Sequence, residues 1–394
     1  MPSETVLVTD GEQRAALAIV RSLGRLGYRV VVGSSRARAL AGASRYAARS
    51  VRFRNPLENP ARYADEVLEA AVREAAQVVL PVTDHSLIAV LPRRADFGTA
   101  VIPFPDAPLH AELSDKGRVM EAARALGIQV PGQQVVESRE AAPPGGLRFP
   151  LVIKPTRSVV PTAGGLLRLG VRYATTPEQL RTVLAGIPVE GFPVLLQERV
   201  MGPGVGVFLL IHEGNPLAQF AHRRIREKPP SGGVSVYRES IPVPAGLGDS
   251  SLALLRSFDW SGVAMVEYKL DAATGQPFLM EINGRFWGSL QLAVDAGVDF
   301  PAMLVDTALG RVPAPVTSYR SGIRSRWWLG DVDHLLARFR RSPEALSLPP
   351  GAPGRGRALM DFLGLWWPGD RAEIFRWNDP RPQARELADW VRGR

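Results

Sequence analysis

Two carboxylate-bearing segments in the second half of the chain carry the clearest candidates for chemistry. Residues 262–270 and 278–283 are two strand-like runs, and residues 271–277 between them form a loop of hairpin length. With the loop centred on Thr274, Glu267 lies opposite Glu281, and Asn283 points to the same face as Glu281. Facing carboxylates repel each other, and a divalent cation removes that cost; two carboxylates and an amide oxygen suit Mg²⁺. A polar hairpin face in contact with solvent explains the same residues equally well.

Lysine is rare in this chain, and its positions are therefore informative. Among 48 basic residues the lysines are Lys116, Lys154, Lys228 and Lys269. A lysine among so many arginines indicates a need for a compact point charge, as at a nucleotide phosphate; chance is the alternative for at least one of them. Lys154 ends an apolar strand and precedes the glycine-bearing loop 157–165, which we interpret as a lid over phosphates. Lys116 lies in the first turn of a predicted helix, where the helix dipole disfavours a cation unless an anion neutralises it.

A basic run forms a second group of candidates. Arg224 and Arg226 lie in it, before the Pro/Gly segment 229–233, and would clamp a transferred phosphoryl group or an acid substrate. A solvent-exposed strand edge is the alternative. For His222 we favour a structural role, and for residues 83–85 helix capping over a substrate contact. Four tryptophans are expected to pack between domains: Trp327, Trp328, Trp366 and Trp367.

Strands and helices alternate over residues 5–104, which predicts an open parallel sheet with residues 101–104 as its last strand. The first turn, residues 9–13, lacks the GxGxxG pattern of dinucleotide sites. A helix over 115–126 capped by Ser114 follows, then a strand-rich region to about residue 310, and a linker is expected at 348–357.

Taken in order, these segments resemble the ATP-grasp superfamily, and most closely its uncharacterised carboligases similar to the large chain of carbamoyl-phosphate synthase. The matching segments are Ser-Asp-Lys at 114–116, Ile-Lys-Pro at 153–155, Gln-Glu at 197–198, Glu267, and Met-Glu-Ile-Asn-Gly-Arg at 280–285. The resemblance implies an α/β chain: a Rossmann-like preATP-grasp domain, a two-subdomain α+β ATP-grasp fold and a C-terminal extension. The implied boundaries are 1–112, 113–195, 196–310 and 311–394.

The resemblance also implies residue roles. Lys116 and Lys154 would bind ATP phosphates, and Arg285 would face the acyl phosphate or the acid. The adenine-binding segment would be Gln197, Glu198, Arg199, Val200 and Met201. The ligands of Mg²⁺, or of Mn²⁺ in its place, would be Glu267, Glu281 and Asn283. Many members place an acidic ribose ligand after this segment, whereas residues 205–207 are Val-Gly-Val, so the ribose contact is unassigned.

These features predict an ATP-dependent carboxylate–amine ligase that forms an acyl phosphate and releases ADP and phosphate. Two alternatives stay open: a carboxylase or carbamoyl-phosphate-forming enzyme that uses a separate carrier or glutaminase subunit, and a non-catalytic nucleotide-binding protein. We expect small-molecule acid and amine substrates, with a homodimer as an assembly that the family allows. The net charge of +9 is spread along the chain, so we expect no nucleic-acid partner. No cysteine, signal or long apolar run occurs, which favours a cytoplasmic protein without membrane contact.

Overall fold

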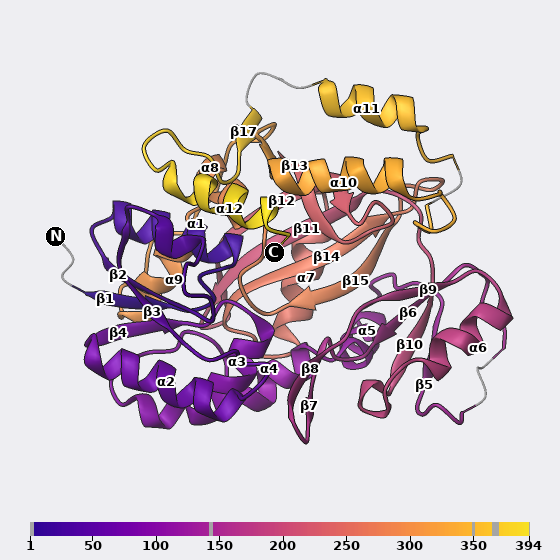
Figure 1. Ribbon diagram of the computed structural model, residues 1–394. Coiled ribbons are helices and arrows are strands. Elements are labelled where there is room, and N and C mark those ends of the chain that lie inside the picture. Colours follow the sequence, from indigo (N-terminus) through magenta and orange to yellow (C-terminus); the bar gives the residue numbers. More distant parts are fainter. Residues whose placement is uncertain (1–3, 142–144, 349–350, 365–369, 394) are drawn as a thin grey trace.

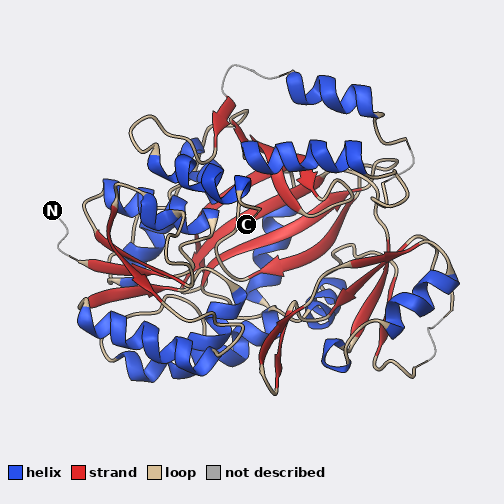
Figure 2. Cartoon of the chain, viewed as in Figure 1, coloured by secondary structure: helices blue, strands red, loops and turns tan. Residues whose placement is uncertain are grey.

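The structure is a computed structural model that describes residues 4–141, 145–348, 351–364 and 370–393. A parallel sheet lies at one side of the molecule, and two mainly antiparallel sheets and a short hairpin make up the remaining strands (Figure 1). Figure 2 shows the largest sheet at the centre, with helices around it. No helix among the described residues is long and apolar enough to cross a membrane.

The N-terminal domain is built on four parallel strands in the order β3-β2-β1-β4. The strands are β1 (Thr5–Val8), β2 (Arg29–Ser34), β3 (Ala47–Arg52) and β4 (Ala76–Leu80), and the helices are α1 (Arg14–Arg25), α2 (Pro60–Arg73), α3 (Asp84–Val90) and α4 (Ala107–Leu113). All four residues of β1 are buried, as expected for a parallel sheet covered on both faces. The strand predicted at 101–104 is wrong: Val101 forms only an isolated bridge to Val78, because the chain turns away at the Pro-rich residues that follow.

A small antiparallel sheet in the order β5-β10-β6-β9 comes next, with a separate two-stranded hairpin. Its strands are β5 (Gln133–Val136), β6 (Leu151–Pro155), β9 (Arg172–Ala174) and β10 (Val194–Glu198), the hairpin is β7 (Val159–Thr162) with β8 (Gly165–Arg168), and the helices are α5 (Lys116–Ala125) and α6 (Pro177–Ala185).

Asp115, not Ser114, caps α5: its carboxylate accepts hydrogen bonds from the N–H groups of Gly117 and Arg118, whereas the Ser114 hydroxyl donates to the carbonyl of His110.

The predicted glycine loop at 157–165 is mostly this β7–β8 hairpin. It reaches the N-terminal domain, where the Leu166 N–H donates to the carbonyl of Leu57 at 2.8 Å. In Figure 1 the hairpin lies between the N-terminal domain and the small sheet.

The large sheet has seven strands in the order β15-β14-β11-β12-β13-β16-β17. They are β11 (Gly204–His212), β12 (Asn215–Lys228), β13 (Val234–Ile241), β14 (Gly262–Leu270), β15 (Pro277–Asn283), β16 (Arg324–Arg326) and β17 (Asp370–Ala372), with helices α7 (Leu247–Arg256), α8 (Leu290–Ala296) and α9 (Phe300–Ala308). All pairs are antiparallel except β16–β17. The apolar core of the N-terminal domain continues into this part through Phe286 and Trp287.

The C-terminal segment adds α10 (Trp328–Arg340), α11 (Arg355–Leu363) and α12 (Arg381–Val391). The predicted linker at 348–357 already contains the start of α11, and residues 349–350 lie outside the described part of the chain. Trp327 packs between domains as predicted, with the Arg14 guanidinium 3.9 Å from its ring centroid. Trp366 and Trp367 lie outside the described residues.

Candidate active site

The carboxylate hairpin forms as predicted. Strands β14 and β15 pair with Glu267 opposite Glu281, and a bulge follows Glu267. The Asn283 side-chain amide donates to Glu281 Oε1 at 3.1 Å, so these two side chains share a face. Among the described residues no group of three or more His, Cys, Asp or Glu side chains is placed to hold a metal. Mg²⁺ needs fewer, because it keeps water and phosphate oxygens in its shell, so this set of two carboxylates and an amide fits it.

Both candidate lysines lie near the hairpin, Lys116 at the start of α5 and Lys154 in β6 of the small sheet. Lys116 Nζ lies 2.9 Å from Ser158 Oγ and 3.9 Å from Glu281 Oε2. Burial lowers the pKa of Lys154 to about 8, although the charge of Glu281 opposes this shift. Burial disfavours ionisation of Glu281, yet Lys116 and Lys154 together hold its pKa below the ordinary value. The lysines and the carboxylate therefore form one electrostatic group at the junction of the two sheets.

Arg224 lies on the other side of the hairpin. Its guanidinium pairs closely with Glu267 and lies 2.7 Å from Glu227 Oε1. Burial raises the pKa of Glu267, and the Arg224 charge acts against that rise. Sequence reasoning did not single out Glu227, whose only signal was its place in the charged run after Arg226. Arg224, almost fully buried and paired with Glu227 and Glu267, places a positive charge next to the candidate metal ligands.

Arg285 joins this group to the N-terminal domain. It donates to Asn283 Oδ1 at 3.0 Å, and its Nε lies 2.9 Å from Asp84 Oδ2. Thr83 caps α3, as favoured from the sequence, because its hydroxyl accepts the N–H of Ser86. Asp84 pairs with Arg285 in addition, and a substrate contact by residues 83–85 stays a prediction. Burial opposes its ionisation, but the Arg285 charge holds its pKa below the ordinary value.

Further carboxylates line the same edge of the parallel sheet. Asp10 follows β1 and lies 3.7 Å from His85 Nε2. Burial and the charge of Asp10 raise the pKa of Glu12. Since the carboxyl ends of parallel strands are where open sheets bind ligands, this edge offers negative charge beside Arg285.

The structure does not bring Arg226 to this group. A bulge in β12 follows Arg224, and the Arg226 guanidinium binds both carboxylate oxygens of Asp331 in α10, at 2.7 and 2.6 Å. His222 is buried, stacks on Phe208 with ring centroids 4.8 Å apart, and lies 3.1 Å from Ser289 Oγ. Burial lowers the pKa of His222 well below its ordinary value, in line with the structural role favoured for it.

The predicted adenine segment connects the two antiparallel sheets, between the end of β10 and the start of β11. The Gln197 side chain is buried and donates to Gln133 Oε1 at 2.9 Å, and Glu198 is engaged by Arg148. The Arg199 guanidinium lies 5.0 Å from the ring centroid of Tyr173. The Met201 carbonyl accepts the N–H of Ala272, and Val200 forms no hydrogen bond with any other residue that the structure describes. The backbone of Val200 is thus the part of this segment that is free to meet an adenine edge.

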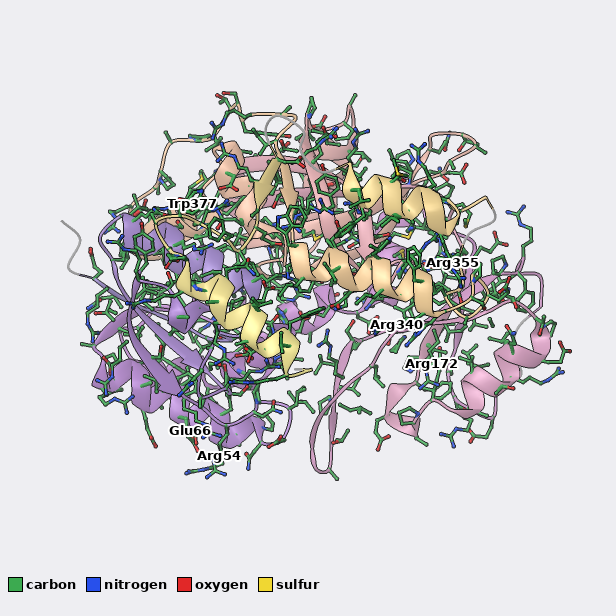
Figure 3. The ribbon with its side chains drawn as sticks, turned by 45° about the horizontal axis from the view of Figure 1, so that its top comes forward. Arg54, Glu66, Arg172, Arg340, Arg355 and Trp377 are labelled. Carbon is green, nitrogen blue, oxygen red and sulfur yellow. The ribbon has the colours of Figure 1, made fainter. Side chains whose placement is uncertain are left out.

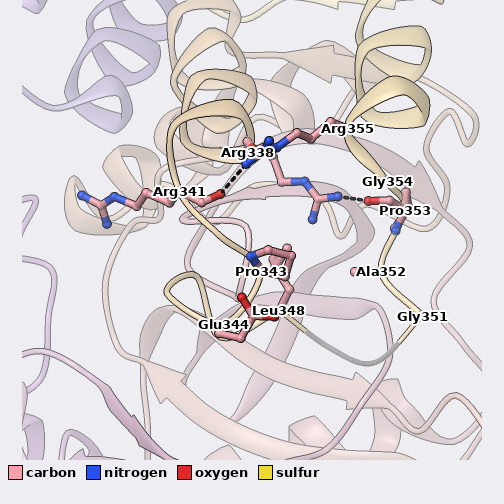
Figure 4. Close-up of a pocket in the computed structure, with 10 residues that line it drawn as sticks. All are labelled: Arg338, Arg341, Pro343, Glu344, Leu348, Gly351, Ala352, Pro353, Gly354 and Arg355. Atoms are coloured by element: carbon pink, nitrogen blue, oxygen red, sulfur yellow. Dashed lines mark hydrogen bonds between the residues drawn. The ribbon is translucent and has the colours of Figure 1, made fainter.

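A cavity of about 390 Å³ also lies between α10 and α11 (Figure 4). Two of its arginines are paired within the chain: Arg338 donates to the Pro353 carbonyl, and Arg355 donates to the carbonyls of Arg338 and Arg341. The bonds from Arg355 connect the start of α11 to the C-terminal end of α10.

Comparison with known proteins shows which family part of this chain resembles. Residues 192–330 match a family model described as "ATP-grasp in the biosynthetic pathway with Ter operon". This match assigns residues 192–330 to the ATP-grasp superfamily. The matched segment contains the hairpin, Arg224 and Arg285.

Relatives of differing activity share this fold. The L-amino acid ligase of Bacillus licheniformis superposes with a TM-score of 0.62 at 16% identity, over 78% of this chain and 75% of that one. The biotin carboxylase domain of the Hydrogenobacter thermophilus 2-oxoglutarate carboxylase, in complex with MgADP, ADP and bicarbonate, gives a TM-score of 0.61 at 15% identity, over 82% and 73%. A putative urea carboxylase of Emericella nidulans is 24% identical over 247 residues, which span 56% of this chain but only 19% of that protein. At these identities the two structures show a shared fold and leave the reaction open.

Proposed function

We propose that this protein is an ATP-dependent carboxylate–amine ligase that forms an amide or peptide bond through an acyl phosphate and releases ADP and phosphate. The observation that carries the proposal is the facing pair Glu267 and Glu281. Lys116 of α5, Lys154 of β6 and Arg285 lie beside this pair. Phosphoryl transfer depends on positioning and charge neutralisation rather than on covalent help from the protein, and this set supplies both.

The roles follow from the positions. Glu267, Glu281 and Asn283 would hold Mg²⁺, which supplies charge at the phosphates when bound. Lys116 and Lys154 would bind the phosphate tail of ATP, and the segment 197–201 would hold the adenine. In the free protein the carboxylate of Glu281 partly neutralises the charges of Lys116 and Lys154. When ATP binds, its phosphates would take over this role for the lysines, and Glu281 would turn to the metal.

The two organic substrates would meet at Arg285. This guanidinium would hold the acid or its acyl phosphate, because planar guanidinium groups bind carboxylate and phosphate oxygens in pairs. Asp10, Glu12 and Asp84 lie at the adjoining sheet edge and suit the cationic form of an amine. Arg285, which would hold the acid, and these carboxylates, which would hold the amine, lie close together. The amine would therefore lie next to the activated carbonyl.

A carboxylase is the second candidate, favoured by the likeness to the bicarbonate-bound carboxylase domain and to the putative urea carboxylase. A carboxylase needs bicarbonate and no second organic acid. ATP turnover that depends on bicarbonate and is unaffected by any acid–amine pair would favour it over the ligase.

Isotope transfer from the acid substrate is the decisive experiment. Carboxylic acids and amines are first screened with ATP and Mg²⁺ for phosphate release, and the active acid is then labelled with ¹⁸O in its carboxylate. The γ-phosphoryl group passes to one acid oxygen, and the amine then expels that oxygen with the phosphate. Label in phosphate together with ADP is the expected result. AMP formation, or amide product with unlabelled phosphate, would overturn the acyl-phosphate mechanism.

A further inference from the structure

A basic pocket lies where α12 meets the loop after β2, away from the residues assigned above. Its cavity measures about 590 Å³. The lining consists of five arginines, one aspartate and two small residues: Arg36, Arg38, Arg52, Arg385, Arg392, Asp389, Ser35 and Ala37. It shares no residue with the candidate active site.

The charges of this pocket are poorly compensated. Asp389 pairs with Arg385 on the same helix, with Oδ2 3.0 Å from Nε. The side chains of Arg36, Arg38, Arg52 and Arg392 form no ion pair or hydrogen bond within the part of the chain that the structure describes. In the cavity between α10 and α11, by contrast, the guanidinium groups of Arg338 and Arg355 donate hydrogen bonds to backbone carbonyls. Several like charges around one hollow concentrate a positive potential there.

Buried contacts fix both walls of the pocket. Asp379, just before α12, lies 2.8 Å from Arg21 of α1, and both side chains are almost fully buried. Asp379 also accepts the Ser44 hydroxyl and the N–H of Arg45, which anchors α12 to the loop beyond β2. On the opposite wall, the Ser34 hydroxyl donates to Glu12 at 2.6 Å. The backbone segments that carry the arginines are thus held in place, whereas the four unpaired arginine side chains are exposed. A ligand would therefore have to order only these side chains, which lowers the free-energy cost of binding.

The pocket also lies at the ligand-binding edge of the N-terminal parallel sheet. Residues 35–38 follow the carboxyl end of β2 and Arg52 ends β3, and this is the edge at which open parallel sheets bind their ligands. A neighbouring hollow of about 550 Å³ shares Ser35 and Arg52 with it and includes Arg54 and Glu66, which pair with each other (Figure 3).

We infer that this pocket binds a small polyanion, a molecule of nucleotide or sugar-phosphate size with two or more phosphate or carboxylate groups. The volume lies in the range of small-molecule sites. Guanidinium groups suit both anion types, because each presents paired N–H donors to two oxygens. This site is separate from the proposed ATP site and stands independently of it.

The test uses the full chain with pyrophosphate and citrate as probes, in titration calorimetry at low ionic strength with MgADP present throughout. The two probes separate phosphate from carboxylate ligands. A double variant, Arg38→Ala with Arg392→Ala, removes two lining arginines. The matched control, Arg124→Ala with Arg340→Ala, removes the same charge from exposed sites of α5 and α10 (Arg340 in Figure 3).

We expect saturable binding of at least one probe. It should weaken at least tenfold in the pocket variant, because two charge-assisted contacts are lost, and change less than twofold in the control. MgADP affinity, measured separately, should be the same in both variants. No saturable binding of either probe, or equal losses in the two double variants, would overturn the inference. So would preferential binding of a DNA duplex or an acidic protein through these arginines.

Discussion

Replacing Lys154 by methionine should stabilise the free protein. Burial lowers the pKa of Lys154 from its ordinary value of 10.5 to about 8, and Glu281 and Glu267 only partly offset this effect. Since each pKa unit corresponds to about 1.4 kcal/mol, keeping the buried ammonium charged costs the folded protein about 3 kcal/mol near neutral pH. Methionine keeps an unbranched apolar stem without the charge. The free energy of unfolding should therefore rise by up to about 3 kcal/mol at pH 7.

The pH dependence of this gain has a definite sign. Below pH 8 Lys154 is protonated in both the folded and the unfolded chain, so the wild-type protein bears the full penalty. Between pH 8 and 10.5 the folded protein loses the proton while the unfolded chain keeps it, and the penalty fades. The stability difference between Lys154→Met and wild type should be largest at pH 7 and shrink toward pH 10, as measured by urea denaturation without nucleotide.

The same substitution should impair nucleotide binding. Loss of a buried charge-assisted contact to phosphate corresponds to about 2–3 kcal/mol, or about 30–150-fold in the Kd for MgATP. Lys269→Met is the control, because Lys269 is only partly buried and its Nζ lies 3.3 Å from the Gly202 carbonyl. Both effects should be smaller there. A Lys154→Met protein that is less stable than wild type at pH 7, or that binds MgATP equally well, would refute the reasoning.

Four further substitutions test the remaining assignments. Glu281→Gln should abolish ATP turnover, followed as ADP release, while the circular dichroism spectrum is retained; near wild-type rates at saturating Mg²⁺ would contradict the metal assignment. Arg224→Ala should lower turnover, whereas Arg226→Ala should mainly lower the melting temperature, and the reverse pattern would show that the two roles are exchanged. Asp379→Ala leaves Arg21 buried without its carboxylate and should cost about 3–5 kcal/mol of unfolding free energy, measured with urea; a loss below about 1 kcal/mol would mean that solvent reaches this pair.

Local patterns in the sequence were sufficient for the hairpin and for the first parallel strands. The lengths of the two strand-like runs and of the loop between them were enough to predict the pairing of Glu267 with Glu281. The buried run of β1 was equally clear. Strand β3 escaped notice because it lies at the edge of its sheet and is largely exposed, so its residues show no apolar alternation.

The partners of charged side chains were decided only by the tertiary structure. In the sequence Arg224 and Arg226 are equivalent, yet a bulge between them sends one to Glu267 and the other to Asp331 in α10. Asp84 meets Arg285 across a domain boundary, about two hundred positions along the chain. Strand and helix periods are local and can be read from neighbouring residues, whereas a charge is paired by whichever element packs against it. The sequence by itself therefore determined the hairpin and the types of side chain available for catalysis, and packing of the domains decided which of them meet.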